Sequence, residues 1–276
     1  MTIITCDAYI FFHLWRTNSN SEKICFMNII VTGASSGIGF QVALQLSKDS
    51  RNKVFAASRS SERLDTLKEE AAHQNSESQI IPLVGDISKP EDILRWKEEL
   101  MNECTHIDFL VNNAGALINK PFLELEDRDW MEVYDTNVFG IVKLVRMLFP
   151  LMERAPGKER SSEVMGGKEV RAHIVNISSM GGVQGSVKFK GLSAYSSSKA
   201  AVINLTECLA EEFGEVGIAV NCLALGSVQT EMFTAAFPEF KAATTPASMA
   251  AFVADFTMTG FRFFNGKIVP VSSSTP

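Results

Sequence analysis

A tyrosine and a lysine stand four positions apart, as Tyr195 and Lys199, in the run Tyr-Ser-Ser-Ser-Lys. In a helix this spacing places both side chains on one face, one turn apart. A phenol, with a pKa of about 10 in water, becomes an acid–base catalyst at neutral pH when a fixed positive charge stabilises its phenolate. The pair therefore predicts proton transfer at a substrate oxygen, although the same spacing also occurs on ordinary helix surfaces.

A serine one element earlier strengthens this interpretation. Ser179 follows an apolar run at residues 172–177 that predicts a strand. Ligands of open α/β sheets bind at the carboxyl ends of the strands, so Ser179 is expected to meet the start of the next helix there. A hydroxyl at that point polarises a carbonyl or stabilises the alkoxide that hydride transfer creates.

A glycine-rich run, Thr-Gly-Ala-Ser-Ser-Gly-Ile-Gly, follows the first predicted strand. Its glycines let the backbone approach a pyrophosphate, and the amides and dipole of the next helix attract the negative charge. A tight strand–helix turn without a ligand is the alternative. The position after the first strand of an alternating chain favours a dinucleotide. The predicted contacts are Thr32, Gly33, Ser35, Ser36, Gly37, Ile38 and Gly39.

The residues after the second predicted strand indicate which dinucleotide is preferred. An acidic residue there binds the ribose 2′-hydroxyl of NAD, whereas an arginine accommodates the 2′-phosphate of NADP. Ser58 stands where the acid would be, and Arg59 follows it. The sequence therefore predicts NADP(H) as cofactor and disfavours NAD(H). A solvated surface arginine is the alternative.

Two further loops are candidates for cofactor contacts. Asp86 and Ile87 follow the third predicted strand. The Asp86 carboxylate either accepts a hydrogen bond from the adenine amino group or caps the next helix, and one group could do both. The fourth strand leads into Asn113, Ala114 and Gly115, whose small side chains leave room for a flat ring system, unless this segment is a plain Asx turn.

Composition limits the classes of partner and compartment. The 276 residues are 46% hydrophobic and 21% charged, as in soluble globular proteins. The net charge is −6 and the basic residues do not cluster, so neither a nucleic-acid nor a membrane partner is expected. Five cysteines without a CxxC pair predict reduced thiols and a cytoplasmic location. The four histidines lack ligand spacing, so no metal site is expected.

Apolar patterning predicts alternating strands and helices. The strands are expected at residues 28–32, 53–57, 79–84, 107–111, 172–177, 218–223 and 267–271. The helices are expected at residues 37–48, 61–73, 90–103, 128–154, 195–215 and 247–256. This order predicts an α/β fold: a doubly wound, mostly parallel seven-stranded sheet of the Rossmann type, with helices on both faces.

The domain organisation follows from the same pass along the chain. Residues 1–26 are expected to form a disordered N-terminal extension, and residues 27–276 a single dinucleotide-binding catalytic domain. Residues 155–170 are rich in Gly, Ser, Lys and Glu and predict a surface insertion. Residues 233–245 carry apolar side chains without a long period and predict a mobile lid over the substrate.

Taken in order, these motifs resemble the short-chain dehydrogenase/reductase family over residues 28–271. The resemblance implies that Ser179, Tyr195 and Lys199 are catalytic, with Lys199 lowering the pKa of Tyr195 and binding the nicotinamide ribose. It implies that Asn137 is the fourth member and supports a water-linked proton path to the lysine. A polar residue at a packing site is the alternative for Asn137.

The same resemblance implies that Val228 and Thr230 contact the nicotinamide carboxamide. In two places the chain departs from the family pattern. Leu225 precedes Gly226 where a Pro-Gly pair is usual, and the segment between Ser179 and the catalytic tyrosine is long. The first departure leaves that turn without the fixed φ of a proline. The long segment removes no catalytic group, but it is expected to reshape substrate access.

The sequence thus predicts an NADP(H)-dependent oxidoreductase that interconverts a carbonyl and an alcohol. The substrate is expected to be a small, mainly apolar molecule, and relatives of this kind imply a homodimer or homotetramer. Two alternatives stay open. One is a non-catalytic dinucleotide-binding sensor or scaffold, and the other is an epimerase or dehydratase that holds its cofactor tightly.

Overall fold

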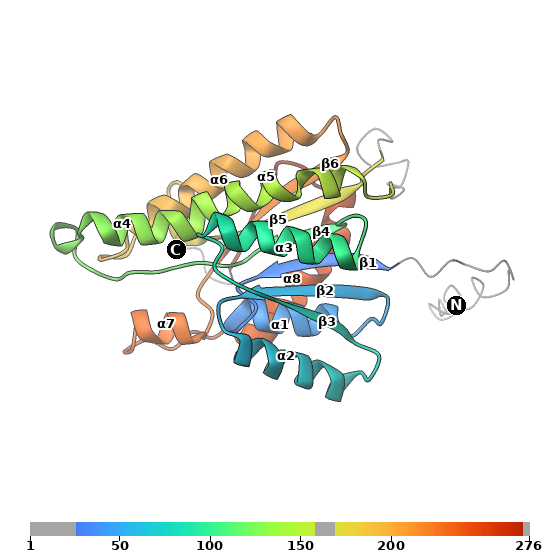
Figure 1. The fold of residues 1–276 in the computed structure, drawn as a ribbon. Helices are drawn as coiled ribbons and strands as arrows, with labels where there is room; N and C mark the ends of the chain where they lie inside the picture. Colours follow the sequence, from blue (N-terminus) through green and yellow to red (C-terminus); the bar gives the residue numbers. More distant parts are fainter. Residues whose placement is uncertain (1–25, 158–168, 273–276) are drawn as a thin grey trace, which may run out of the picture.

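Seven parallel strands form one sheet in the order β3-β2-β1-β4-β5-β6-β7 (Figure 1). The computed structural model describes residues 26–157 and 169–272. The strands are β1 (Met27–Thr32), β2 (Asn52–Ser58), β3 (Gln79–Val84), β4 (Phe109–Asn112), β5 (Ala172–Ser179), β6 (Ile218–Leu225) and β7 (Ile268–Val271). The predicted doubly wound sheet is confirmed, and every pairing in it is parallel. The strand order reverses between β1 and β4, the place where such sheets bind ligands.

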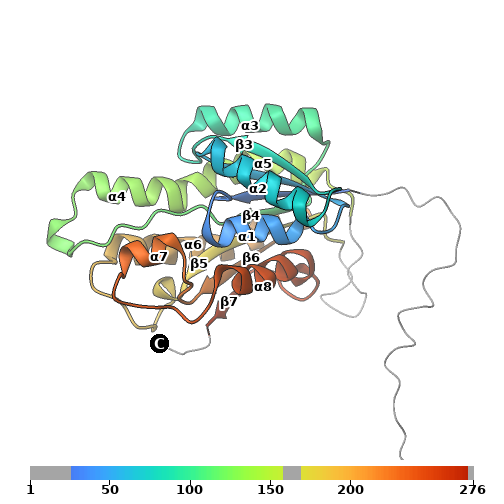
Figure 2. The same ribbon diagram turned by 90° about the horizontal axis from the view of Figure 1, so that it is seen from below.

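Helices cover both faces of the sheet, as Figure 1 shows. Helices α1, α2 and α8 pack on one face, and α3, α5 and α6 pack on the other. The helices are α1 (Gly37–Leu46), α2 (Ser61–Gln74), α3 (Pro90–Glu103), α4 (Asp127–Tyr134), α5 (Gly140–Glu153), α6 (Ser193–Phe213), α7 (Glu231–Ala236) and α8 (Pro246–Thr259). Figures 1 and 2 both place α4 and α7 beyond the carboxyl ends of the strands.

The core consists of two apolar layers, one on each side of the sheet. Along β1, Ile29 and Val31 belong to the first layer, whereas Ile30 belongs to the second. All three side chains are buried, because a parallel sheet covered on both faces needs apolar residues at every position. The strands therefore appear in the sequence as continuous apolar runs, which is why their positions could be predicted.

The long helix predicted at residues 128–154 is divided in the structure. Helix α4 leads into a π-helical turn at Asp135–Phe139, and α5 follows it directly. The side chain of Asn137, in the middle of this turn, binds the backbone of Ala116. Asn137 therefore ties this turn to the loop after β4. π turns within helices often lie at functional positions.

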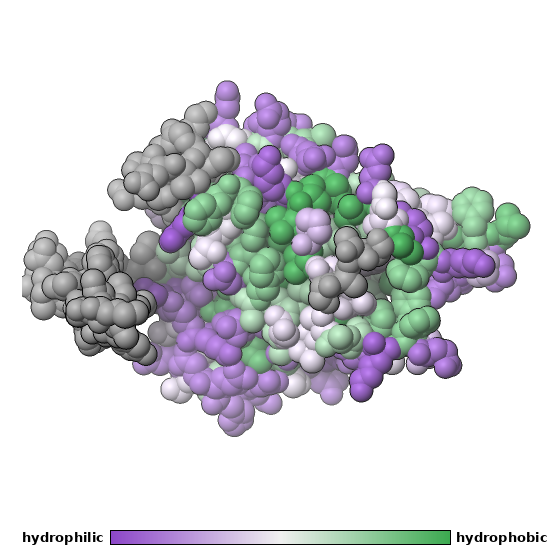
Figure 3. Space-filling view, turned by 180° about the vertical axis from the view of Figure 1, so that it is seen from behind, coloured by the Kyte–Doolittle hydropathy of each residue, from purple (hydrophilic) through white to green (hydrophobic). Residues whose placement is uncertain are grey.

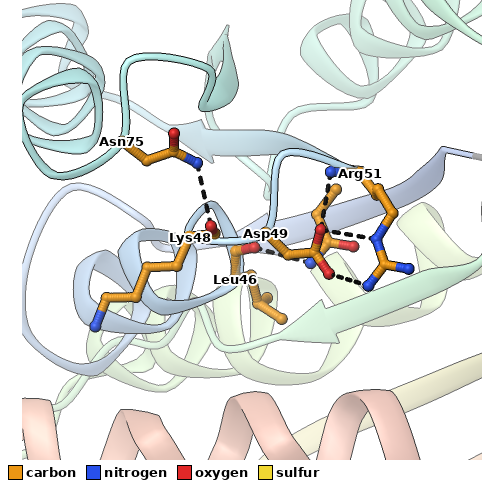
Figure 4. A network of polar contacts seen from close by, with 6 residues as sticks. Leu46, Lys48, Asp49, Arg51 and Asn75 are labelled. Atoms are coloured by element: carbon orange, nitrogen blue, oxygen red, sulfur yellow. Dashed lines mark hydrogen bonds and ion pairs between the residues drawn. The ribbon is translucent and has the colours of Figure 1, made fainter. Parts of the chain in front are cut away.

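The connection between α1 and β2 is fixed by polar contacts far from the carboxyl ends of the strands (Figure 4). The Asp49 carboxylate accepts hydrogen bonds from the backbone and guanidinium of Arg51, at 2.7–3.0 Å. Asn75, after α2, donates to the carbonyl of Lys48 at 3.1 Å. These bonds hold the turn that aligns β2 beside β1.

Some predicted segments lie wholly or partly outside the described residues. The extension at residues 1–26 is described only at Phe26, and residues 158–168 of the predicted insertion are outside the described ranges. The predicted lid at residues 233–245 begins inside α7 and ends beside Val228, which forms a bridge with Thr244.

The surface combines charged and apolar areas. Figure 3 shows apolar residues across the middle of the face opposite that of Figure 1, with hydrophilic residues along its lower edge. Exposed aromatic side chains in the described ranges include Phe252, Phe263 and Phe264. Within those ranges, no helix combines the length and apolarity needed to cross a bilayer.

Candidate active site

Ser179, Tyr195 and Lys199 come together at the carboxyl edge of the sheet. Ser179 is the last residue of β5, and Tyr195 lies in the first turn of α6. The hydroxyl of Ser179 hydrogen-bonds the side chain of Tyr195. The Lys199 Nζ lies 5.8 Å from the centroid of the tyrosine ring. The structure therefore places a hydroxyl, a phenol and an ammonium group side by side.

The electrostatics of this cluster differ from the expectation. Burial raises the pKa of Tyr195, and the hydrogen bond with Ser179 opposes that shift. Burial lowers the pKa of Lys199 from 10.5 to about 8. The expectation that Lys199 lowers the pKa of Tyr195 is not met in the protein alone, because desolvation of the phenol is the largest effect and Ser179 supplies the opposing one.

Hydrogen bonds of both its backbone and its side chain fix the position of Lys199. Only 4% of the residue is exposed, and its Nζ donates to the carbonyl of Ile177 at 2.9 Å. The hydroxyl of Ser178 donates to the Lys199 carbonyl at 2.8 Å. These contacts fix the ammonium group and leave it further donors for a ligand, since a lysine has three.

Asn137 is fully buried and bonded to the protein on both sides of its amide. Its Oδ1 accepts from the Ala116 amide at 2.7 Å, and its Nδ2 donates to the Ala116 carbonyl at 3.0 Å. The Nδ2 also donates to the Ser198 hydroxyl at 2.9 Å. A Cβ added to Gly115 would lie 3.5 Å from both Asn137 Oδ1 and Lys199 Nζ. Asn137 thus joins the loop after β4 to α6, beside the buried lysine.

The glycine-rich loop packs directly against the end of β4. Gly33 has a φ of +68°, and a Cβ there would lie 2.8 Å from the Cα of Ala114. A Cβ on Gly39 would collide with Asn113 Nδ2 and the Gly33 carbonyl. Asn113 Nδ2 donates to the carbonyls of Thr32 and Gly33 at 3.0 and 3.3 Å. The loop conformation therefore requires glycine at these positions.

The start of α1 fits a pyrophosphate. Ser36 precedes the helix with extended backbone, and its side chain makes no capping hydrogen bond. The first-turn amides therefore lack a side-chain acceptor and suit an anion. Ser35, Ser36 and Gly37 also line a cavity of about 270 Å³. A Cβ added to Gly37 would lie 3.2 Å from Thr230 Cγ2, so the loop meets the segment after β6 here.

The other candidate cofactor residues lie at the carboxyl ends of the strands as well. Ser58 is buried, and its hydroxyl accepts from the Ser60 amide at 3.2 Å, whereas Arg59 is exposed. The Asp86 carboxylate accepts from the Ser88 amide at 2.8 Å. This bond closes an Asx turn in the loop that leads to α3, and α3 itself has no side-chain cap, so the structure displays neither a capping role nor an adenine contact for Asp86. Ile87, the next residue, is buried.

Thr230 caps α7, since its hydroxyl accepts from the Phe233 amide at 3.1 Å. The Thr230 amide donates to the carbonyl of Val228 at 2.7 Å. Val228 is buried, and Thr230 lies against Gly37 of the glycine-rich loop. The two residues that the family resemblance picked out are therefore brought beside the predicted cofactor loop.

Four phenylalanines form a cluster that the sequence motifs did not predict. The Phe237 ring lies 5.3 Å from Phe233, 5.9 Å from Phe189 and 6.3 Å from Phe240, between centroids. Phe189 belongs to the segment between Ser179 and α6, and the other three belong to α7 and the loop after it. The four-residue spacing of Phe233 and Phe237 was the available signal. We call these four residues the aromatic rim.

A model of the family described as short chain dehydrogenase matches residues 27–240. The chain belongs to the short-chain dehydrogenase/reductase family. It is similar to a 3-oxoacyl-[acyl-carrier-protein] reductase of Staphylococcus epidermidis, with 30% identity over 77% of this chain and 79% of the relative. An enzyme of the same name from Thermotoga maritima is 31% identical over 79% of this chain and 78% of the relative.

Solved structures of this family resemble the whole fold. A putative NAD(P)-dependent gluconate 5-dehydrogenase from Beutenbergia cavernae, with bound NADP, has a TM-score of 0.75 at 26% identity, covering 89% of this chain and 95% of its own. Actinorhodin polyketide ketoreductase with NADPH also has a TM-score of 0.75 at 26% identity, and the match covers 90% of this chain and 96% of the ketoreductase.

In the described ranges of our chain, no group of His, Cys, Asp or Glu is placed to hold a metal ion.

Proposed function

We propose that this short-chain dehydrogenase/reductase is an NADP(H)-dependent enzyme that interconverts a carbonyl and an alcohol. The observation that carries the proposal is the Tyr195 phenol, which is hydrogen-bonded to Ser179 and has the buried Lys199 one turn along α6. The cluster lies at the sheet edge where the glycine-rich loop fits a pyrophosphate.

Each residue of the cluster has a role that follows from its position. The Tyr195 phenol gives its proton to the substrate oxygen during reduction and takes it back during oxidation. Its raised pKa keeps this proton in place at neutral pH, which suits reduction. The Ser179 hydroxyl holds the same oxygen. NADP(H), when bound, supplies or accepts the hydride. Lys199 would bind the nicotinamide ribose, and Asn137 would keep the loop after β4 in position.

The cofactor would be held by the carboxyl-end loops described above. The glycine-rich loop would bind the pyrophosphate, and Asn113, Ala114 and Gly115 would border the flat rings. Arg59, exposed after β2, would bind the 2′-phosphate. The NADP and NADPH bound in similar solved structures support this choice over NAD(H).

A mainly apolar carbonyl compound is the substrate class that the aromatic rim supports. The rim places four phenyl rings between α7 and the segment that joins Ser179 to Tyr195. Similar proteins are named for the reduction of 3-oxoacyl groups and of polyketides, which are also ketones. We further infer a cytoplasmic enzyme, which suits the free thiols of Cys104, Cys208 and Cys222.

The test measures the turnover of a panel of apolar ketones. The reaction is monitored through the absorbance of NADPH. Tyr195→Phe should lower kcat/KM by about 100-fold or more, because general acid catalysis contributes about 10²–10⁴-fold. Its dissociation constant for NADPH should stay within about twofold of the wild-type value. Tyr134→Phe, which removes the hydroxyl of a tyrosine on α4, is the control and should retain activity.

Two results would contradict the proposal. Wild-type protein that binds NADPH but turns over no ketone in either direction would indicate a sensor or scaffold. Turnover of a substrate without net release of oxidised cofactor would indicate an epimerase or dehydratase.

A further inference from the structure

The cavity of about 270 Å³ beside the glycine-rich loop is lined by side chains of opposite charge. Ser35, Ser36 and Gly37 line it from the loop, Arg63 lines it from α2, and Glu231 lines it from α7. One wall is therefore backbone that fits a phosphate, and the other carries one cation and one anion.

Arg63 and Glu231 form an ion pair across this cavity. The Arg63 Nη1 lies 2.9 Å from Glu231 Oε2, and the hydrogen bond with Glu231 raises the pKa of Arg63. The two side chains are 51% and 70% exposed. Ion pairs that are this exposed contribute little to stability. An anion with more charge than a carboxylate can therefore take Arg63 from Glu231 with little loss to the fold.

Glu231 is kept at the cavity by the backbone around it. It is the first residue of α7, directly after the capping residue Thr230. Thr230 packs against Gly37, and the backbone amide of Gln229 donates to the Thr244 carbonyl at 2.9 Å. The backbone of α7 therefore holds Glu231 where its carboxylate is within reach of Arg63.

Arg63 lies close in the chain to the arginine already assigned to the 2′-phosphate. Arg59 and Arg63 stand on either side of Ser60, which caps α2 and accepts from the Arg63 amide at 3.3 Å. Arg59 lies before this cap and Arg63 is the third residue of α2, so two arginines flank the start of the helix, and only Arg63 of the two is paired with an acid of another element.

We propose that Arg63 is a second cation for the 2′-phosphate of the dinucleotide, and that Glu231 competes with this phosphate for the same guanidinium. The proposal rests on the proposed function, because it assigns residues to the cofactor of that reaction. A phosphate carries about −1.5 to −2 charge and three acceptor oxygens, so it outcompetes one carboxylate. A dinucleotide without the 2′-phosphate leaves Arg63 paired with Glu231. Glu231 therefore lowers the affinity for NADPH and leaves the affinity for NADH unchanged.

The experiment measures dissociation constants of NADPH and NADH by calorimetry, without substrate. Arg63→Ala should weaken NADPH binding about tenfold, as expected for loss of a charge-assisted hydrogen bond, and change NADH binding less than twofold. Glu231→Gln should tighten NADPH binding about threefold without affecting NADH. In the Arg63→Ala background, Glu231→Gln should have no effect. Glu62→Gln removes an exposed acid next to Arg63 and is the control for general charge effects.

If Arg63→Ala weakens the binding of NADPH and NADH equally, the proposal is overturned and Arg63 is a structural residue. Tightening by Glu231→Gln that persists without Arg63, or that Glu62→Gln reproduces, would replace competition with general repulsion and would also overturn it. A wild-type protein that binds neither dinucleotide, or binds NADH as well as NADPH, would instead contradict the proposed function. If the Ala variant fails to fold, Arg63→Lys replaces it in the experiment. This variant keeps the charge and should retain part of the NADPH affinity.

Discussion

Lys199 is a group whose burial opposes folding. Lys199 is 4% exposed, and its pKa in the folded protein is about 8. In the unfolded chain the same group holds its proton up to about pH 10.5. Between these two values the unfolded state binds more protons, so the free energy of unfolding rises with pH across that window. Below pH 8 the folded state carries the full penalty, about 3 kcal/mol for a shift from 10.5 to about 8.

We therefore expect Lys199→Met to be more stable than wild type at pH 7, by about 1–3 kcal/mol after loss of the bond to the Ile177 carbonyl. The advantage should shrink as the pH approaches 10, because the wild-type lysine is then neutral. Urea unfolding at several pH values measures this difference. Lys190→Met, at an exposed lysine of the segment between Ser179 and α6, should leave stability nearly unchanged. A variant that is less stable than wild type at pH 7 would contradict the expected penalty.

At the scale of elements, the π-helical turn between α4 and α5 fixes the loop after β4. Its Asn137 makes three hydrogen bonds, two to Ala116 and one to Ser198. Removal of the amide leaves these groups without partners in a buried place. Asn137→Ala should therefore destabilise the protein by about 1–3 kcal/mol and also lower kcat, because Lys199 and Gly115 lie beside it.

Thermal unfolding and steady-state rates below the transition separate the two effects. Asn221→Ala is a matched control. Asn221 is also fully buried, and it accepts from the Lys267 amide at 3.0 Å and donates to the Phe264 carbonyl at 3.0 Å. The control should lose similar stability and keep its rate. If Asn137→Ala also keeps its rate, Asn137 is only a packing residue.

The elements differ in how far the sequence predicted them. β3 and α3 begin and end at the predicted residues, because an apolar run and a proline at the first helical position are local signals. The break of the long helix at Asn137 has no such signal, since the π turn depends on Ala116, which is close in space but belongs to another element.

The candidate site shows the same division. The motifs around Gly33, Ser179 and Tyr195 could be placed because strand ends of a parallel sheet meet at one edge. The raised pKa of Tyr195 could not be predicted, because the desolvation of the phenol depends on packing that spacing does not describe. The ion pair of Arg63 with Glu231 joins two exposed residues far apart in the chain, so no periodicity indicated it.

At the scale of the whole molecule, exposed aromatic side chains gather around α8 and the turn after it. Phe252, in the middle of α8, is 40% exposed, and Phe263 and Phe264, which follow the turn after this helix, are 56% and 36% exposed. Phe256 links them, with its ring 6.1 Å from Phe252 and 5.8 Å from Phe264. Exposed apolar patches of this kind are typical of protein–protein contacts. We propose that this face contributes to a homodimer or homotetramer.

Sedimentation should therefore give two or four times the chain mass of 30.3 kDa. Phe263→Ser should shift the protein towards the monomer, because it removes apolar area from that face. Phe122→Ser, which replaces a phenylalanine that is 64% exposed before α4, is the control and should leave the mass unchanged. A wild-type monomer at all concentrations would exclude the assembly.

The contact of Gly39 with Gly33 and Asn113 has a consequence for the tolerance of the gene to mutation. Even one methyl group at Gly39 meets backbone on one side and a hydrogen-bonded amide on the other. In a saturation library selected for folded product, every codon that replaces this glycine by another residue should disappear. Gly185, by contrast, has a φ of +79°, but no atom lies within 4 Å of its added Cβ. Substitutions there should survive at intermediate frequency, limited by backbone strain alone.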